Sequence, residues 1–167
     1  SGNSNNSIKT YPAAFENVIS VSAVGVSNNF DYIPASYSNF GQWIDISAPG
    51  GELSTNFGII SLFPNNSYYS TQGTSMAAPF VTGVAALIFA NNPFLTNIEA
   101  RNILLSQVWD MGANGFDEYY GNGMTCAICA FLRACQNMKI SISTNGPTNI
   151  CQGGSVLLSV PNNFNVT

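Results

Sequence analysis

The segment GTSMAAP at residues 73–79, which continues directly into the apolar run Phe80–Ala90, decides how the rest of this chain is interpreted. Residues 76–90 contain no charged side chain, so the pattern predicts a helix that is apolar on every side, as in the core of an α/β domain. Pro79 is expected in the first turn, where its missing N–H costs nothing. Ser75 then lies at the helix N-terminus, where free N–H groups favour negative charge, and is a candidate nucleophile.

Two interpretations of Ser75 follow from this pattern. A serine before a helix is more often an N-cap than a nucleophile. The whole string, however, resembles the active-site serine segment of the subtilisin-like serine proteases (subtilases, the peptidase S8 family), including the following stretch VTGVAAL at residues 81–87. It differs from the nucleophile elbow of the α/β-hydrolases, because Ala77 stands where that motif requires glycine.

The resemblance implies both a fold and an activity. The fold is an α/β, three-layer subtilisin-like fold with a mainly parallel sheet, of which this chain would hold the C-terminal half. The activity is that of a serine endopeptidase, which hydrolyses peptide bonds of proteins through an acyl-enzyme on Ser75. Gly73 and Thr74 would shape the turn that presents the nucleophile, as part of the substrate-binding site.

The N-terminal cluster SGNS at residues 1–4 indicates a loop when it is considered alone. Beside the Ser75 motif, Gly2-Asn3 resembles the Gly-Asn pair that supplies the side-chain donor of the oxyanion hole in subtilases. Asn3 is therefore a candidate catalytic residue, opposite the backbone N–H of Ser75. The resemblance further implies that Ser1 and Gly2 line part of the primary specificity pocket.

Composition excludes several classes of partner. Of the 167 residues, 46% are hydrophobic and only 7% are charged, a balance that we associate with extracellular rather than cytosolic proteins. The net charge is −4, and the four basic residues are scattered, which argues against nucleic acid as a partner. The longest apolar run is shorter than the roughly twenty residues that span a bilayer, so no membrane segment is predicted.

The rest of the first 137 residues alternates predicted strands and helices. Strands are expected over Val18–Val24, Asp45–Gly50 and Gly58–Leu62, with a surface loop at 51–57 and a turn at 64–67. A capping-box sequence, Thr96 to Glu99, predicts a helix over 97–107, and a last helix is expected over 125–136. Asp31 and Asp45 are interpreted as structural or solvated carboxylates.

The four cysteines are Cys126, Cys129, Cys135 and Cys151. A Cys-x-x-Cys spacing fits a redox pair or half of a metal site, but a chain without histidine and with one further cysteine nearby is poorly suited to tetrahedral zinc. We therefore interpret these residues as small apolar side chains, predict no metal site from them, and leave their oxidation state open. No cofactor is required; the resemblance is compatible with structural calcium but assigns no ligands.

The character of the sequence changes from Met138. Residues 139–143 and 155–160 are predicted strands, and the segment around Cys151 resembles the opening of the Ig-like or PKD-like repeats of secreted bacterial enzymes. The expected domains are thus 1–137, the C-terminal part of a subtilisin-like peptidase domain, and 138–167, the first strands of an Ig-like/PKD-like β module, the beginning of a small all-β sandwich.

The chain contains no histidine, whereas a subtilisin-type mechanism needs a histidine base oriented by an aspartate. In subtilases both precede the serine, so we expect them in a missing N-terminal part, with which this half would pair to cleave a protein or peptide substrate outside the cell or at its surface. A sedolisin-like Ser-Glu-Asp peptidase and a non-catalytic, protease-like scaffold remain alternatives; Asn3 favours the subtilisin interpretation. A Ser75–Lys9 dyad has no other support. Peptide specificity and oligomeric state stay open.

Overall fold

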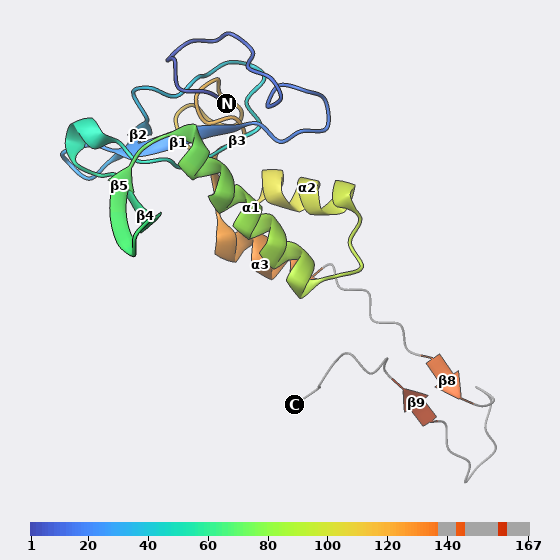
Figure 1. Cartoon of the computed structure of the whole chain (residues 1–167). Coiled ribbons are helices and arrows are strands. Elements are labelled where there is room, and N and C mark those ends of the chain that lie inside the picture. The colour runs from blue at the N-terminus through green and yellow to red at the C-terminus, as the bar shows by residue number, and fades with distance from the viewer. Residues whose placement is uncertain (137–142, 146–156, 160–167) are drawn as a thin grey trace. The chain divides into compact units, whose positions relative to one another are not determined.

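The computed structural model describes residues 1–136, 143–145 and 157–159, which belong to two units, Ser1–Gln136 and Asn137–Thr167 (Figure 1). In the second unit, β8 (Ser143–Asn145) and β9 (Leu157–Ser159) pair antiparallel, with Thr144 opposite Leu158. Cys151 and most of the predicted Ig-like/PKD-like module lie outside the described residues. The all-β sandwich therefore stays a prediction.

A five-stranded sheet organises the first unit. Its strand order is β2-β1-β3-β7-β6, formed by β1 (Val21–Val26), β2 (Tyr32–Pro34), β3 (Ile46–Pro49), β6 (Val108–Trp109) and β7 (Met124–Thr125). The three central strands run parallel, whereas both edge strands are antiparallel to their neighbours. The prediction of a mixed α/β fold built on a parallel sheet is confirmed.

Three helices of the described residues, α1 (Thr74–Asn91), α2 (Asn97–Ser106) and α3 (Ala127–Gln136), lie on the same side of this sheet (Figure 1). Side chains that alternate along β1 and β3 point toward them, and together they form the main core. The core residues of the two strands are Val21, Ala23, Ile46 and Ala48. The other face carries a smaller cluster of Val24, Tyr120 and Met124, so the third layer of the expected fold is not seen in this part of the chain.

Helix α1 departs in two ways from the sequence prediction. Its buried side chains include Val81, Val84 and Ile88, but Phe80 and Leu87 are 45% and 46% exposed, so the helix is not buried on every side. Pro79 lies in the second turn rather than the first, which leaves the Ser75 carbonyl without its usual i+4 amide donor. Helix α1 is long and apolar enough to cross a membrane, but the core helices of globular proteins can have the same length and composition. In this structure α1 packs against β1 and β3.

The segment between β3 and α1 forms a hairpin that the sequence predicted only in part. A 3₁₀ turn (Leu53–Thr55) leads into β4 (Ile59–Phe63), which pairs antiparallel with β5 (Ser67–Thr71). The turn at 64–67 was expected and contains Asn65 and Asn66, both with positive φ. Strand β5 was missed.

The two later helices begin close to where the sequence placed them. Thr96 and Glu99 cap α2 reciprocally: the Thr96 Oγ1 accepts from the Glu99 amide at 3.2 Å, and the Glu99 carboxylate accepts from the Thr96 amide at 2.8 Å. Helix α3 starts at Ala127, two residues later than predicted. These helices pack against α1 and complete the core beneath the strand ends.

Candidate active site

Ser75 is the second residue of α1 and is exposed at its N-terminus. The N-cap residue is Gly73, and it forms no side-chain cap hydrogen bond. The capping interpretation of Ser75 is therefore wrong, because the serine lies two residues inside the cap. Its amide is among the helix N–H groups without an intrahelical acceptor, and the positive end of the helix dipole is at the same place.

Asn3 reaches this helix end from a loop seventy residues away in sequence. Its Oδ1 accepts two hydrogen bonds from Thr74, one from the backbone N and one from Oγ1, both at 2.9 Å. The Gly2 amide in turn donates to Thr74 Oγ1 at 3.2 Å. Because the Asn3 oxygen is engaged by Thr74, the amide orientation is set and its Nδ2 remains as the donor on the opposite side.

Gly73 leaves a small space beside both donors. A Cβ built on Gly73 would lie 3.5 Å from Asn3 Nδ2 and 3.7 Å from the backbone N of Ser75, with Met76 Sδ at 3.4 Å. Gly73 also has a φ of +151°, a conformation that side chains with a Cβ rarely adopt. The glycine thus permits the turn and leaves open a space close to both of these nitrogen atoms.

The turn is tied to the carboxyl end of the parallel sheet. The Gly73 amide donates to the carbonyl of Gly50, directly after β3, and to the hydroxyl of Tyr37, both at 2.9 Å. Active sites of parallel α/β sheets lie at this edge. The sequence did not predict a role for Tyr37, because the partners of its hydroxyl, Gly50, Gly51 and Gly73, are distant in the chain.

An open apolar cavity of about 350 Å³ adjoins Ser75 on the side of the hairpin. Its lining combines β4 with the first turns of α1 and includes none of the residues from the N-terminal loop. It is lined by Ile59, Ile60, Ser61, Ser75, Met76, Pro79 and Phe80. In the described part of the chain, no side chain, that of Lys9 included, hydrogen-bonds the Ser75 hydroxyl.

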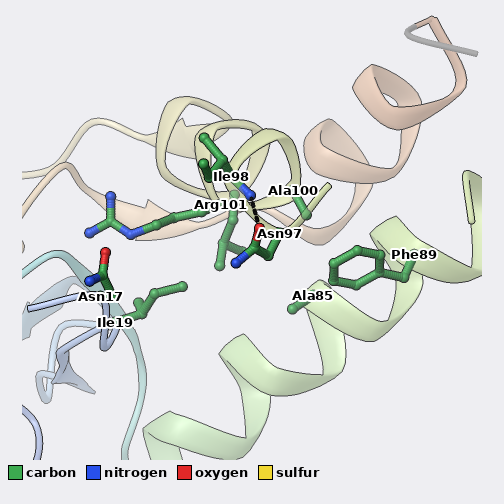
Figure 2. Close-up of a pocket in the computed structure, with 9 residues that line it drawn as sticks. Asn17, Ile19, Ala85, Phe89, Asn97, Ile98, Ala100 and Arg101 are labelled. Atoms are coloured by element: carbon green, nitrogen blue, oxygen red, sulfur yellow. Dashed lines mark hydrogen bonds between the residues drawn. The ribbon is translucent and has the colours of Figure 1, made fainter. Parts of the chain in front are cut away.

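A second pocket, of about 250 Å³, lies between α1 and α2 (Figure 2). Ala85 and Phe89 of α1 line it together with residues of α2, and Arg101 of α2 extends toward Asn17, which lies before β1. Arg101 pairs with Asp45 at 2.6 Å, and Asp45 also accepts from the Ser20 amide at 2.8 Å. Asp45 therefore has the structural role predicted for it, and this pocket shares no lining residue with the Ser75 cavity.

The cysteines complete the comparison with the sequence prediction. Cys126 and Cys129 form a disulfide at the start of α3. The oxidation state of this pair, which the sequence left open, is therefore oxidised, and the two cysteines form a covalent cross-link rather than acting only as small apolar side chains. The thiol of Cys135 accepts from Asn91 Nδ2 at 2.7 Å. Among the described residues, no group of three or more His, Cys, Asp or Glu side chains is arranged to hold a metal ion.

Ser75 thus lies at a helix N-terminus, at the carboxyl edge of a parallel sheet and near the Asn3 side-chain amide, an arrangement compatible with a hydrolytic site. Residues 1–123 match the Subtilase family of peptidase S8. Subtilisin BL of Lederbergia lenta is 38% identical over 130 residues, 78% of this chain and 44% of that protein. The cell wall-associated protease of Bacillus subtilis (strain 168) is 37% identical over 117 residues, 70% of this chain and 12% of that protein.

Solved structures agree with the sequence relatives. A protease of Pseudoalteromonas arctica PAMC 21717 superposes with a TM-score of 0.66 at 34% identity, over 80% of this chain and 41% of that chain. Sphericase gives a TM-score of 0.65 at 34% identity, over 74% of this chain and 45% of that chain. The chain belongs to the subtilase family. It spans less than half the length of these relatives.

Proposed function

We propose that this chain is the C-terminal half of the catalytic domain of a serine endopeptidase that hydrolyses peptide bonds of proteins. The observation that carries the proposal is the space beside Gly73, where a built Cβ would lie 3.5 Å from Asn3 Nδ2 and 3.7 Å from the Ser75 amide nitrogen. An oxygen that becomes negative during acyl transfer needs fixed N–H donors in such a space. The Asn3 oxygen bound by Thr74 keeps one donor oriented before substrate arrives.

The chemistry assigned to this half is nucleophilic. Ser75 Oγ attacks the scissile carbonyl, the carbonyl oxygen becomes an oxyanion between the two donors, and collapse of this intermediate releases the amine and leaves an acyl-enzyme on Ser75. Water then attacks the ester, and the carboxylic acid leaves. The proton on Ser75 goes to a histidine base oriented by an aspartate, both supplied by an N-terminal part. Ser1 and Gly2 line part of the pocket for the residue before the scissile bond, and Gly73 and Thr74 shape the turn that presents the nucleophile.

An apolar stripe on α1 supports the need for a second half. Met76, Phe80, Gly83 and Leu87 recur at the three- and four-residue spacing of one helix face. Phe80 and Leu87 are nearly half exposed, and a Cβ built on Gly83 would contact nothing within 4 Å. We assign this stripe, together with the cavity beside Ser75, to contact with the N-terminal part, which would bring the base to the serine.

The substrate class and the place of action follow as part of the same proposal. Substrates are proteins or peptides, and the enzyme acts outside the cell or at its surface, as the low content of charged residues indicates. The similar protease of Bacillus subtilis is cell wall-associated. The serine mechanism itself uses no cofactor. Structural calcium, for which we assign no ligands, would serve stability rather than chemistry.

The test is labelling by a fluorophosphonate probe, which reacts with activated serines. The whole protease should be labelled at Ser75 and should hydrolyse a protein substrate, whereas its Ser75→Ala variant should do neither. The isolated 167-residue chain, without the base, should react slowly. Rapid labelling of the isolated chain at Ser75 would refute the assignment of the base to a second half, and protease activity that survives Ser75→Ala would refute Ser75 as the nucleophile.

A further inference from the structure

Tyr37, which lies between β2 and β3, places its hydroxyl at the junction of three backbone segments. The hydroxyl lies 2.8 Å from the carbonyl oxygens of both Gly50 and Gly51, and 2.9 Å from the amide nitrogen of Gly73. A phenol has one hydrogen to donate, so the two carbonyls share it while an oxygen lone pair accepts from Gly73. One side chain thus joins the end of β3 to the turn before the nucleophile.

The ring of Tyr37 is also fixed, by packing rather than by hydrogen bonds. It packs against the main core cluster of the sheet and α1. A Cβ built on Gly50 would lie 2.9 Å from the Tyr37 hydroxyl and 3.0 Å from the Gly73 carbonyl, so these segments approach as closely as glycine allows. Movement of the hydroxyl away from Gly73 would therefore require displacement of the core or of the strand end.

Glu52 ties the backbone just before Tyr37 to the segment that follows β3. Its side chain is 1% exposed, and Oε2 accepts from the amide of Ser36, the residue before Tyr37, at 2.7 Å. Oε1 accepts from the Ser54 hydroxyl at 2.6 Å. Burial alone would raise the pKa of Glu52, but these hydrogen bonds outweigh it and hold the pKa below its ordinary value, so the carboxylate stays ionised. The buried carboxylate thus holds Tyr37 close to Gly50 and Gly51, whose carbonyls share the hydroxyl proton.

We propose that Tyr37 is a positioning residue of the active site, which orients the Ser75 amide through its hydrogen bond to Gly73. Asn3 holds the same turn from the other side, through Thr74. The Ser75 N–H that faces the oxyanion space is two residues from Gly73, so a tilt of the Gly73 peptide changes the direction of that donor. The inference rests on the proposed function, because it assigns Tyr37 a role in the same reaction.

Tyr37→Phe in the whole protease is the test, since it removes the hydroxyl and keeps the ring. Tyr32→Phe on β2 is the matched control, as the Tyr32 side chain is 51% exposed. We expect kcat per titrated active site to fall on the order of tenfold in Tyr37→Phe with KM changed less than twofold, because misplacement of a transition-state donor lowers kcat rather than substrate binding. Tyr32→Phe should leave both constants unchanged. In the double variant with Asn3→Ala, the fold-loss in kcat should be smaller than the product of the fold-losses in the two single variants, since both residues act on one turn.

The outcomes separate this inference from the proposed function. Full activity of Tyr37→Phe, or a reduced number of titrated sites with normal kcat at each, would overturn the positioning role while Ser75-dependent activity remained. A rise confined to KM, or losses with Asn3→Ala that simply multiply, would also overturn it. If the protease with Tyr37 intact kept its activity when Ser75→Ala was introduced, the proposed function itself would fail.

Discussion

The turn at Gly73–Ser75 and the apolar stripe on α1 lie on one helix, but the turn has partners within this chain for most of its polar groups, whereas the stripe leaves apolar side chains exposed. At the turn, polar groups from three distant segments converge, and most of them have a partner. Along the stripe, Phe80 and Leu87 are exposed and Gly83 faces open space. Under the proposed function, the oxyanion side of the site is organised within this chain, whereas the stripe is a surface for the N-terminal part. The predictions below test each side of that comparison.

The largest effect is expected from Gly73→Ala in the whole protease. The added methyl would occupy the space between Asn3 Nδ2 and the Ser75 amide, at 3.5 and 3.7 Å, and exclude the oxyanion. We expect kcat to fall by about 10²–10³-fold, the cost of losing one such donor, a range obtained with a subtilisin and so not independent of the family. The unfavourable φ should cost about 1–3 kcal/mol of folding free energy, measured by denaturant unfolding. Normal kcat in a folded variant would contradict the assigned oxyanion space.

Gly83→Leu tests the other side of the comparison. In the isolated chain, replacing a helix-interior glycine that faces open space should stabilise the fold by about 0.5–1 kcal/mol. In the whole protease, the same side chain should clash with the part that covers the stripe and lower activity, with a lower thermal midpoint. Thermal unfolding of both forms is the measurement. Equal stabilisation in both would mean that nothing packs on Gly83.

A change in stability of about the same size as that of Gly83→Leu is expected with pH. Burial, and to a lesser extent the charge of Glu52, raise the pKa of Tyr37 to about 12, although the hydrogen bond from Gly73 lowers it. Because the pKa of an unfolded tyrosine is about 10, the stability contributed by the neutral phenol is complete below pH 10 and is lost between about pH 10 and 12. Tyr37 is half-buried, so after solvent screening we expect a loss on the order of 1 kcal/mol. Urea unfolding at pH 9 and pH 11.5 should show this slope reduced in Tyr37→Phe; an identical slope would contradict the shifted pKa.

Local patterns in the sequence predicted most of the framework. The apolar run after Ser75, the Thr96–Glu99 capping box and the strand patterns gave α1, α2, β1, β3 and β4 to within a few residues. These features depend on neighbours in the chain, which is why they are visible in sequence. Strand β5 was missed because its Ser and Tyr residues lack a clear apolar alternation. Its backbone is held in strand conformation by the antiparallel pairing with β4.

The site shows the limit of such reasoning more clearly. Ser75 and Asn3 were predicted through a family resemblance, and the structure brings both to one helix end. Tyr37, buried Glu52 and the Cys126–Cys129 disulfide were not predicted, because the contacts of Tyr37 and Glu52 join segments far apart in the chain and the oxidation of a Cys-x-x-Cys pair is not encoded by its spacing. The exposed face of α1 was also unexpected, since composition alone cannot tell which side of an apolar helix meets a partner.

The most direct test of the central claim is the kcat of Asn3→Asp in the whole protease. The aspartate keeps an oxygen to accept from Thr74, and so preserves the turn, but replaces the Nδ2 donor by a negatively charged oxygen. The account predicts a loss of at least about 10²–10³-fold in kcat, with KM and the thermal midpoint little changed. A variant with normal kcat would show that Asn3 serves only to hold Thr74, and would contradict the oxyanion site proposed here.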